Sequence, residues 1–406
     1  PMRYLITILL TISALFAETK HLIAPDGTTV IIDRDEYGVP HIKADNETAM
    51  FFGQGFAEAN DRLYQIDLNR RAATGRLSEW FGSLALDVDK ELLRTGYSDA
   101  EIDAMIANTL PEVQNAIQIY ADGINAYVDT MNLHPELYMP EQYLDRDFDP
   151  FTLRDGSAFA VFMLRRFGMF GGEELSRLNE LQNNGWDWFN ENRPVNDPAC
   201  STTIPDTGQA ATQAWHYSGM TVPEEVVLEM EARNEYVMQF WKDNGIIYKL
   251  GSFAALVDPG FSTSGNVMLL GCPQMGSPSY NEASVTMEIE LECPTYHIGG
   301  KTIPGVPFVT LGHNEHIAWT WTSGVSDNVD TYIDSTQSNN FNDGYWHNGE
   351  WLDFEVIVDT IKMIAGEEIF THYRTIHGPV VSSYLPTRSE ERRVGKECRS
   401  RWSPYH

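Results

Sequence analysis

The pattern of hydrophobic and polar positions divides the chain into a helical first part and a later part rich in strands. Apolar residues recur at helical spacing through residues 45–131, and Pro111 is suited to the first turn of a helix. The positions with this spacing are Val113, Ile117, Tyr120, Ile124 and Tyr127. Residues 155–181 predict another helix, broken at Gly171-Gly172, and residues 224–242 form a charged amphipathic stretch.

After residue 252 the period of the pattern becomes two, which indicates half-buried β-strands. Valine, methionine, isoleucine and leucine alternate with threonine and glutamate through residues 285–292. Further strands are predicted near residues 308–311, 317–321, 354–361 and 375–381, most of them close to Gly, Asn or Asp turn residues. Helices first and antiparallel strands afterwards predict an α+β fold.

Composition narrows the class of protein. The chain of 406 residues is 42% hydrophobic and 12% aromatic, which is typical of a globular protein with a large core. Its formal net charge of −30 is spread along the chain and argues against binding to nucleic acid or to an anionic membrane. Bound calcium or a saline habitat can account for part of this acid, and composition leaves both open.

Both ends of the chain differ from its middle. The apolar run 5–16 follows Arg3 and ends at Ala17, so residues 1–17 are typical of a bacterial signal peptide and predict a periplasmic or secreted protein. The run is too short to span a bilayer. Residues 388–406 hold six Lys/Arg against three Asp/Glu and resemble a translated sequencing adapter rather than a natural basic tail. We therefore expect a truncated fragment whose own sequence ends near Thr387.

Cysteines and histidines offer two further possibilities, neither of them specific. Cys272 and Cys293 bracket a predicted hairpin and can pair in an oxidising compartment if the strand separation allows it, while Cys200 lies in a linker region. Connectivity cannot be read from sequence. His313 and His316 suggest zinc, but their spacing is not His-Glu-x-x-His and no third ligand is apparent, so zinc is disfavoured.

Several short motifs occur in a fixed order along the chain. They cover residues 35–42, 53–65, 70–72, 75–79, 120–126, 196–198, 273–276 and 312–319. Together with Gly251-Ser252 they resemble the penicillin acylase family of N-terminal nucleophile hydrolases. The Gly-x-Gly at residues 53–55 is not a dinucleotide-binding motif, because it lacks the third glycine and the βαβ context.

The resemblance implies that the precursor cuts itself between Gly251 and Ser252. A serine hydroxyl needs a base, and an α-amino group with a pKa of about 7.7–8.0 is suited to that task. The implied function is hydrolysis of a linear amide, such as a penicillin or cephalosporin side chain or a related N-acyl compound. An N-acyl-homoserine lactone is the alternative substrate, and an inactive calcium-stabilised secreted protein is the alternative of another class.

The resemblance also implies the fold and its division. The fold is a four-layer αββα sandwich with two antiparallel sheets between helical layers and its C-terminal part missing. Two subunits come from one precursor. Residues 18–205 form a helical α-subunit region, residues 206–251 a spacer, and residues 252–387 the N-terminal part of the catalytic β-subunit.

Matching the family's motifs gives the candidate site. Gln274 is expected beside the nucleophile's amino group, and the main-chain N–H of Ser323 is expected in the oxyanion hole. Met163, Phe167 and Met275 are expected to line an apolar pocket for the acyl group. The residues after Ser252 depart from the pattern, because Phe253-Ala254-Ala255 stand where most relatives begin with asparagine.

A calcium site follows from the same resemblance, with one ion per heterodimer. Asp327 and Asp330 would supply carboxylates and Val329 a main-chain carbonyl, which are the hard oxygen ligands that calcium prefers. Glu174 is the preferred ligand from the other subunit, with Glu173 as the alternative.

Overall fold

The computed structural model describes residues 19–168, 172–193, 222–246, 249–275, 285–323, 328–336 and 341–382. It is a mixed α+β protein with helices and several sheets. The chain divides into two compact units. The first unit comprises residues 1–169, 236–325 and 358–370, and the second comprises residues 170–235, 326–357 and 371–406. The predicted signal peptide and the segment 388–406 lie outside the described residues.

The first unit contains a seven-stranded sheet in the order β1-β2-β3-β6-β7-β8-β9. Its strands are β1 (Lys20–Ile23), β2 (Thr29–Arg34), β3 (Pro40–Ala44), β6 (Met287–Cys293), β7 (Tyr296–Thr302), β8 (Val309–His313) and β9 (Ala318–Trp319). Neighbouring strands are antiparallel except β3 and β6, which run parallel with Ile42 opposite Leu291.

The strands of this sheet correct two expectations from the sequence. The sheet is not purely antiparallel, and residues 18–205 are not only helical, because three strands of the sheet lie between residues 20 and 44. The two-residue period was present in β2, where Val30 and Ile32 are buried. The strand is short, and its hydrophobic stripe is completed only by Ile42 of β3.

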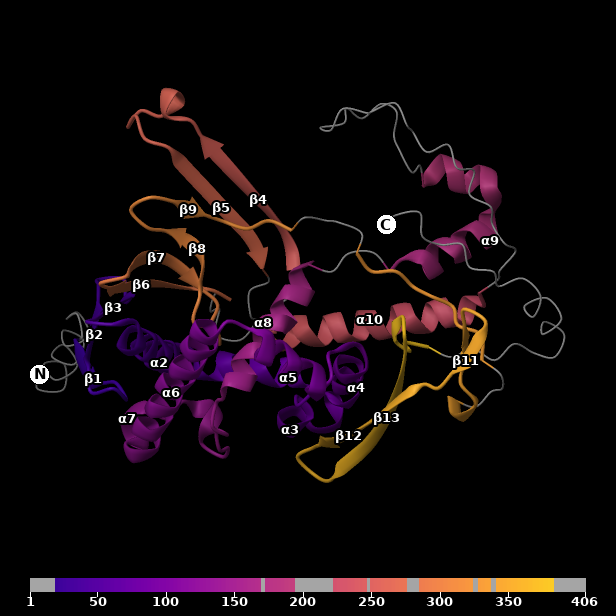
Figure 1. Ribbon diagram of the computed structural model, residues 1–406, viewed down its shortest axis with the longest axis horizontal. Coiled ribbons are helices and arrows are strands. Elements are labelled where there is room, and N and C mark those ends of the chain that lie inside the picture. Colours follow the sequence, from indigo (N-terminus) through magenta and orange to yellow (C-terminus); the bar gives the residue numbers. More distant parts are fainter. Residues whose placement is uncertain are drawn as a thin grey trace, which may run out of the picture. The chain divides into compact units, whose positions relative to one another are not determined.

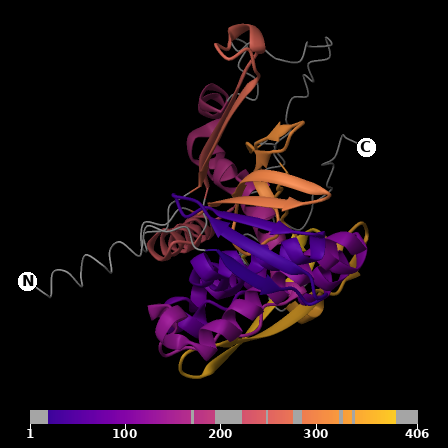
Figure 2. The same cartoon turned by 90° about the vertical axis from the view of Figure 1, so that its left-hand side faces the viewer.

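Helices cover one side of this sheet. The long helices are α2 (Glu47–Thr74), α6 (Pro111–Leu133) and α8 (Leu153–Gly168), and shorter ones are α3 (Ser78–Phe81), α4 (Leu86–Thr95), α5 (Asp99–Asn108) and α7 (Pro135–Tyr138). Helix α2 packs against β2, β3 and β6 as well as against α6 and α8. Figure 2 shows the indigo and purple helices on one side of the strands.

The Gly-x-Gly of α2 allows close packing. A Cβ atom on Gly55 would lie 2.0 Å from the carbonyl oxygen of Tyr120, and one on Gly123 would lie 2.1 Å from that of Phe52. A Cβ atom on Gly53 would lie 2.4 Å from Cγ1 of Val30 in the sheet. These glycines therefore let α2 approach α6 and the sheet more closely than any side chain would permit.

The helical predictions agree with the structure. Helix α6 begins at Pro111, and Ile117, Tyr120, Ile124 and Tyr127 are buried on it. The helix expected over residues 155–181 is two helices, α8 and α9 (Glu174–Asn192), which agrees with the predicted glycine break. Gly172 has a φ of 76°, a left-handed conformation that suits glycine.

The strand predictions agree except for the last. In β6, Met287, Ile289 and Leu291 are buried as their period indicates. The segments 308–311, 317–321 and 354–361 overlap β8, β9 and β12 (Glu355–Lys362). The strand expected over residues 375–381 is confirmed only in part, because β13 (Glu367–Thr375) ends at its start and the chain turns into the two-residue strand β14 (Gly378–Pro379). Gly378, with a φ of 122°, makes that turn possible.

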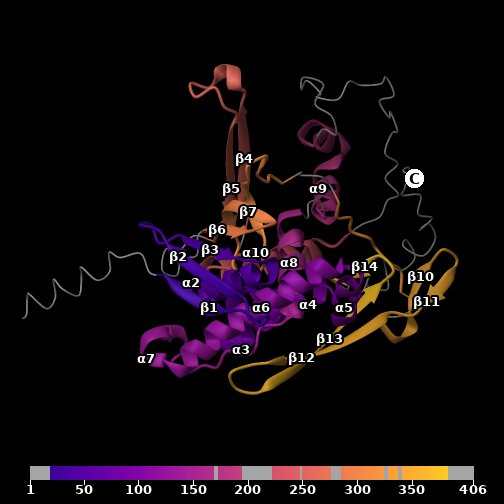
Figure 3. The same cartoon turned by 60° about the vertical axis from the view of Figure 1, so that its left-hand side comes forward.

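A long hairpin of β4 (Lys249–Val257) and β5 (Met268–Met275) also belongs to the first unit. Figures 1 and 3 show it extending away from helices α2 and α6 of the same unit. Cys272 of β5 and Cys293 of β6 both have free thiols, so the possible bridge between them is not formed. Cys200 lies outside the described residues.

Helix α10 (Glu224–Asn244) lies within the predicted spacer, and its end is part of the core of the first unit. Val237 and Trp241 of this helix are buried, as is Ile246 after it. The Trp241 ring meets the ring of Phe162 of α8 edge to face, with 6.2 Å between centroids.

The second unit has its own small core. Val222, Val226 and Val227 are buried against Leu175 and Leu178 of α9. Its strands include the hairpin of β10 (Tyr345–His347) and β11 (Glu350–Leu352). No helix among the described residues of either unit is long and apolar enough to cross a membrane.

Candidate active site

Ser252 lies inside strand β4, where it pairs with Pro273 of β5. It is half-buried, and the bond to Gly251 is part of the continuous strand. The main-chain N–H of Ser323 donates to Ser252 Oγ over 3.3 Å. The fold therefore brings together a serine hydroxyl and a main-chain donor that are far apart in sequence.

The side chain of Ser323 has a contact of its own. Its hydroxyl donates to the carbonyl oxygen of Phe167 over 3.1 Å. Phe167 lies in the last turn of α8, so this hydrogen bond ties the loop after β9 to the end of that helix. This hydroxyl had no expected role, because the predicted oxyanion donor is the main-chain N–H of Ser323.

Gln274 lies against the peptide before Ser252. It is the cross-strand partner of Gly251, and a Cβ atom on Gly251 would lie 2.5 Å from Gln274 Oε1. A larger residue at position 251 would displace the amide. The structure thus brings Gln274 next to the bond between Gly251 and Ser252, where cleavage is predicted.

The three predicted pocket residues belong to one hydrophobic core. Met163 is buried, and Phe167 and Met275 are partly buried against the same cluster. Met275 directly follows Gln274 at the end of β5, and Phe167 accepts the hydrogen bond from Ser323. Met275 is therefore on the same strand as Gln274, and Met163 and Phe167 are on the helix whose last turn Ser323 contacts.

Arg166 connects the pocket helix to α10. Its guanidinium lies over the ring of Trp241, 3.6 Å from the centroid, and donates to the sulfur of Met238 over 3.4 Å. Burial, with the neighbouring charge of Arg165, lowers the pKa of Arg166 to about 10, so the group stays charged at neutral pH. The predicted spacer thus packs on the helix that carries Met163 and Phe167.

The residues predicted to bind calcium belong to the second unit. The carboxylate of Glu174 accepts a hydrogen bond from the main-chain N–H of Thr331 over 3.2 Å. The N–H of Gly172 donates to the carbonyl oxygen of Val329 over 2.6 Å. The structure therefore brings the start of α9 to the segment that carries Val329 and Asp330.

Glu173, the alternative to Glu174 as a predicted calcium ligand, is exposed and forms an ion pair with Arg177 one turn later. Asp330 is exposed, and Asp327 lies outside the described residues. The exposed Asp330 and the nearby Glu174 carboxylate are the hard oxygen donors that calcium prefers.

A buried network joins the helices to a loop of the sheet. The carboxylate of Glu58 accepts hydrogen bonds from the hydroxyl of Tyr120 at 2.5 Å and from the side chain of Gln54 at 2.8 Å. The N–H of Gly305 donates to the same tyrosine hydroxyl over 2.8 Å. Burial raises the pKa of Glu58 to about 7. This network was not predicted from the sequence, although Glu58 and Tyr120 both lie within motifs of the family (residues 53–65 and 120–126).

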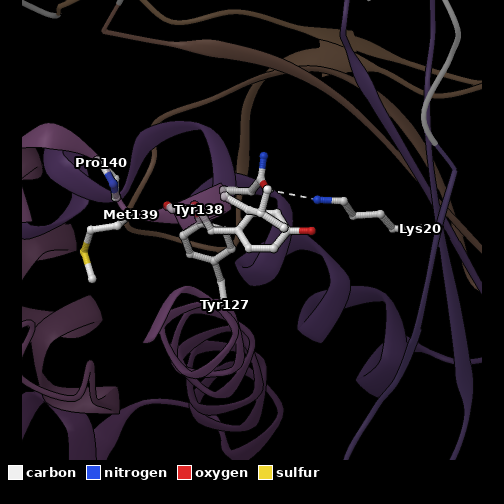
Figure 4. Close-up of a pocket in the computed structure, with 7 residues that line it drawn as sticks. Lys20, Tyr127, Tyr138, Met139 and Pro140 are labelled. Atoms are coloured by element: carbon white, nitrogen blue, oxygen red, sulfur yellow. Dashed lines mark hydrogen bonds between the residues drawn. The ribbon is translucent and has the colours of Figure 1, made fainter. Parts of the chain in front are cut away.

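A surface hollow of about 360 Å³ lies elsewhere on the first unit. Figure 4 shows Lys20, Tyr127, Tyr138, Met139 and Pro140 around it. The Lys20 ammonium lies 5.1 Å from the centre of the Tyr138 ring. None of the predicted site residues lines this hollow.

The model of the penicillin amidase family matches residues 29–406. The chain belongs to this family.

Individual relatives are similar over most of the chain. Penicillin G acylase of Escherichia coli is 29% identical over 399 residues, covering 88% of this chain and 46% of that protein. Acyl-homoserine lactone acylase QuiP of Pseudomonas aeruginosa is 27% identical, covering 88% and 41%, and penicillin acylase 2 proenzyme of Pseudomonas sp. is 25% identical, covering 87% and 43%. The chain thus spans less than half the length of these relatives.

A solved structure is also similar in sequence. A chain of thermostable penicillin G acylase from Alcaligenes faecalis is 31% identical, with 44% of this chain and 97% of that chain covered and a TM-score of 0.39.

Proposed function

We propose that this chain is part of an exported acylase that hydrolyses linear amides with Ser252 as its nucleophile. The main observation in support is the hydrogen bond from the N–H of Ser323 to Ser252 Oγ, in a chain of the penicillin amidase family. A hydroxyl beside an oriented main-chain donor is suited to acyl transfer, because that donor can stabilise the oxyanion that forms on attack. Export rests on the apolar run 5–16 of the sequence.

Maturation uses the same atoms. In the uncut chain, Ser252 Oγ attacks the carbonyl carbon of Gly251 and forms an ester as the C–N bond breaks. The hydroxyl proton passes to the nitrogen, which leaves as the α-amine of Ser252. Water then hydrolyses the ester and leaves a carboxylate on Gly251. The free α-amino group of Ser252 becomes the base that takes the hydroxyl proton, through water, when a substrate amide is attacked. Gln274 lies against Gly251 and is proposed to orient this peptide and later the amino group.

The two pieces made by this cleavage remain associated without the covalent link. Strand β3 comes from before residue 251 and β6 from after it, and they share a parallel ladder of main-chain hydrogen bonds. The hydrogen bonds among Glu58, Tyr120 and Gly305 join the same two parts inside the core. The mature protein is therefore proposed to be a heterodimer from one precursor.

Met163, Phe167 and Met275, which pack in one hydrophobic core, are proposed to line an apolar acyl pocket that suits two substrate classes. Penicillin and cephalosporin side chains are the first candidates. N-acyl-homoserine lactones are the second, because six of the similar proteins are named acyl-homoserine lactone acylase QuiP. Calorimetric measurement of the binding of phenylacetate and of dodecanoate to the processed protein distinguishes the two substrate classes. Tighter binding of dodecanoate that is lost in Phe167→Ala would favour the lactone class.

We also propose one calcium ion in the second unit. Its ligands are the carboxylates of Asp327, Asp330 and Glu174 and the carbonyl oxygen of Val329. Calcium bound to the folded state raises thermal stability by mass action, so chelation should lower the melting temperature in the parent chain and have no effect in Glu174→Gln. Equal effects of chelation on both proteins would count against these ligands.

The test of the nucleophile is mass spectrometry of the purified chain. Wild type should give two polypeptides, the second starting at Ser252. Ser252→Ala should stay uncut, while the matched variant Ser262→Ala, ten residues on in the same hairpin, should be cut like wild type. Cleavage of Ser252→Ala at the same bond would refute the assignment, and an uncut wild type would favour an inactive calcium-stabilised protein.

A further inference from the structure

A cluster of histidine and carboxylate side chains lies on the sheet of the first unit, on the face turned away from the helices. Glu290 and Glu292 of β6 alternate with the buried Ile289 and Leu291, so their side chains share the more exposed face. His41 of β3 is in register with Glu290, and His297 of β7 is in register with Glu292. Neither the calcium residues nor the site around Ser252 belong to this cluster.

The ligand atoms of this cluster converge. Those of Glu290, Glu292 and His297 all lie within 4.8 Å of one another. The distance from His297 Nε2 to Glu290 Oε1 is 3.3 Å. In a tetrahedral zinc site with bonds of about 2.0–2.2 Å, two ligand atoms are about 3.3–3.5 Å apart. Two of the three side chains therefore already have the separation that a shared ion requires.

The orientation of His297 supports the same conclusion. Its Nδ1 lies 2.5 Å from Glu315 Oε1, so the carboxylate of Glu315 accepts the Nδ1–H and Nε2 is left facing Glu290. Histidines that bind metal ions usually donate their other ring N–H to a carboxylate, which sets the tautomer and the ring orientation. His41 orients Glu290 in a similar way, because its Nδ1 lies 2.5 Å from Glu290 Oε2.

We propose that Glu290, Glu292 and His297 bind a divalent transition metal ion, with Glu315 and His41 orienting the ligands. An imidazole with two carboxylates suits zinc, copper or nickel, whereas calcium takes only oxygen ligands. The ion would join β6 to β7 and hold Glu290 against His41 of β3. It would therefore stabilise the parallel strand pair that links the two parts of the chain on either side of residue 251.

Lys43 provides a way to separate this proposal from a set of ordinary surface ion pairs. Its ammonium lies 2.8 Å from Glu292 Oε2 and neutralises that carboxylate when no metal is present. A metal ion has to compete with it. Removing the ammonium in Lys43→Met should therefore tighten metal binding, although it removes an ion pair from the metal-free protein.

The experiment is calorimetric titration of the full chain with zinc chloride, in excess calcium so that the proposed calcium site is filled. Wild type should bind one zinc ion, with at least tenfold weaker binding in His297→Ala and Glu292→Gln and about 10–100-fold weaker binding in Glu315→Gln. Lys43→Met should bind more tightly. His134→Ala, which removes an exposed histidine beside a single glutamate, is the control and should bind as wild type does.

Cobalt provides a second readout that is independent of heat. Its visible absorption bands should show four-coordinate binding in wild type and disappear in His297→Ala, with circular dichroism confirming that each variant is folded. Absence of zinc binding by wild type would overturn the proposal. Unchanged affinity in folded His297→Ala, or weaker binding in Lys43→Met, would overturn it as well.

Discussion

The buried carboxyl group of Glu58 should make the stability of the protein depend on pH. It is fully buried, and both of its oxygens accept hydrogen bonds, from Tyr120 and from Gln54. Desolvation disfavours the ionised form, which raises the pKa of Glu58 from 4.5 to about 7 despite these donors. The perturbation is Glu58→Gln, which preserves the shape of the group and removes its ionisation.

The sign of the effect follows from the raised pKa. Between pH 4.5 and about 7 the folded state holds a proton that the unfolded state has lost, so the contribution to stability is complete below pH 4.5 and is lost as the pH rises to about 7. Each pH unit in that interval changes the free energy of unfolding by about 1.4 kcal/mol. The whole interval therefore changes it by about 3 kcal/mol.

The assay is urea unfolding of wild type and Glu58→Gln from pH 4.5 to 8, followed by tryptophan fluorescence. Wild type should lose about 3 kcal/mol of stability relative to the variant across this range, and the difference should level off above pH 7. Glu141→Gln, at an exposed position, is the control and should follow wild type at every pH. A difference between wild type and Glu58→Gln that does not vary with pH, or that varies in the opposite direction, would refute the reasoning.

Three other substitutions test the packing and the site. Gly123→Ala would put a Cβ atom 2.1 Å from the carbonyl oxygen of Phe52, and we expect a loss of about 1–3 kcal/mol or more, seen as a lower melting temperature; an unchanged value would contradict the close approach of the helices. Ser323→Ala keeps the main-chain donor and removes only the hydrogen bond to Phe167, so the rate of self-cleavage should fall by less than about tenfold, against about 10²–10³ for loss of an oxyanion donor. Trp241→Ala should destabilise the uncut chain by about 3–5 kcal/mol, because Trp241 is buried in its core. It should not affect a protein from which the spacer has been excised, and melting curves of the two forms measure this difference.

The helices were predictable because their signals are local. The spacing of Ile117, Tyr120 and Ile124 places them on one side of any α-helix, and Pro111 marks its start in the sequence itself. The alternation in β6 is equally local, and it also indicates that Glu290 and Glu292 share a face. What these patterns do not contain is the identity of the partner strand.

Pairings between distant segments were not predictable in the same way. The parallel contact of β3 with β6 joins Ile42 to Leu291, and no local period distinguishes it from other pairings. The hairpin of β4 and β5 was missed because Phe253, Leu256, Met268 and Leu270 are exposed on it, so it lacks the alternation that marks a half-buried strand.

The sequence by itself determined the family, the nucleophile candidate Ser252 and the residue types of the site, because these depend on motifs that are read in order along the chain. Only the tertiary structure decided which groups meet. The N–H of Ser323 reaches Ser252, and Glu315 reaches His297, only because the folded chain brings separate elements together. Burial is a collective property of the packed chain, and for that reason no single segment reveals these contacts.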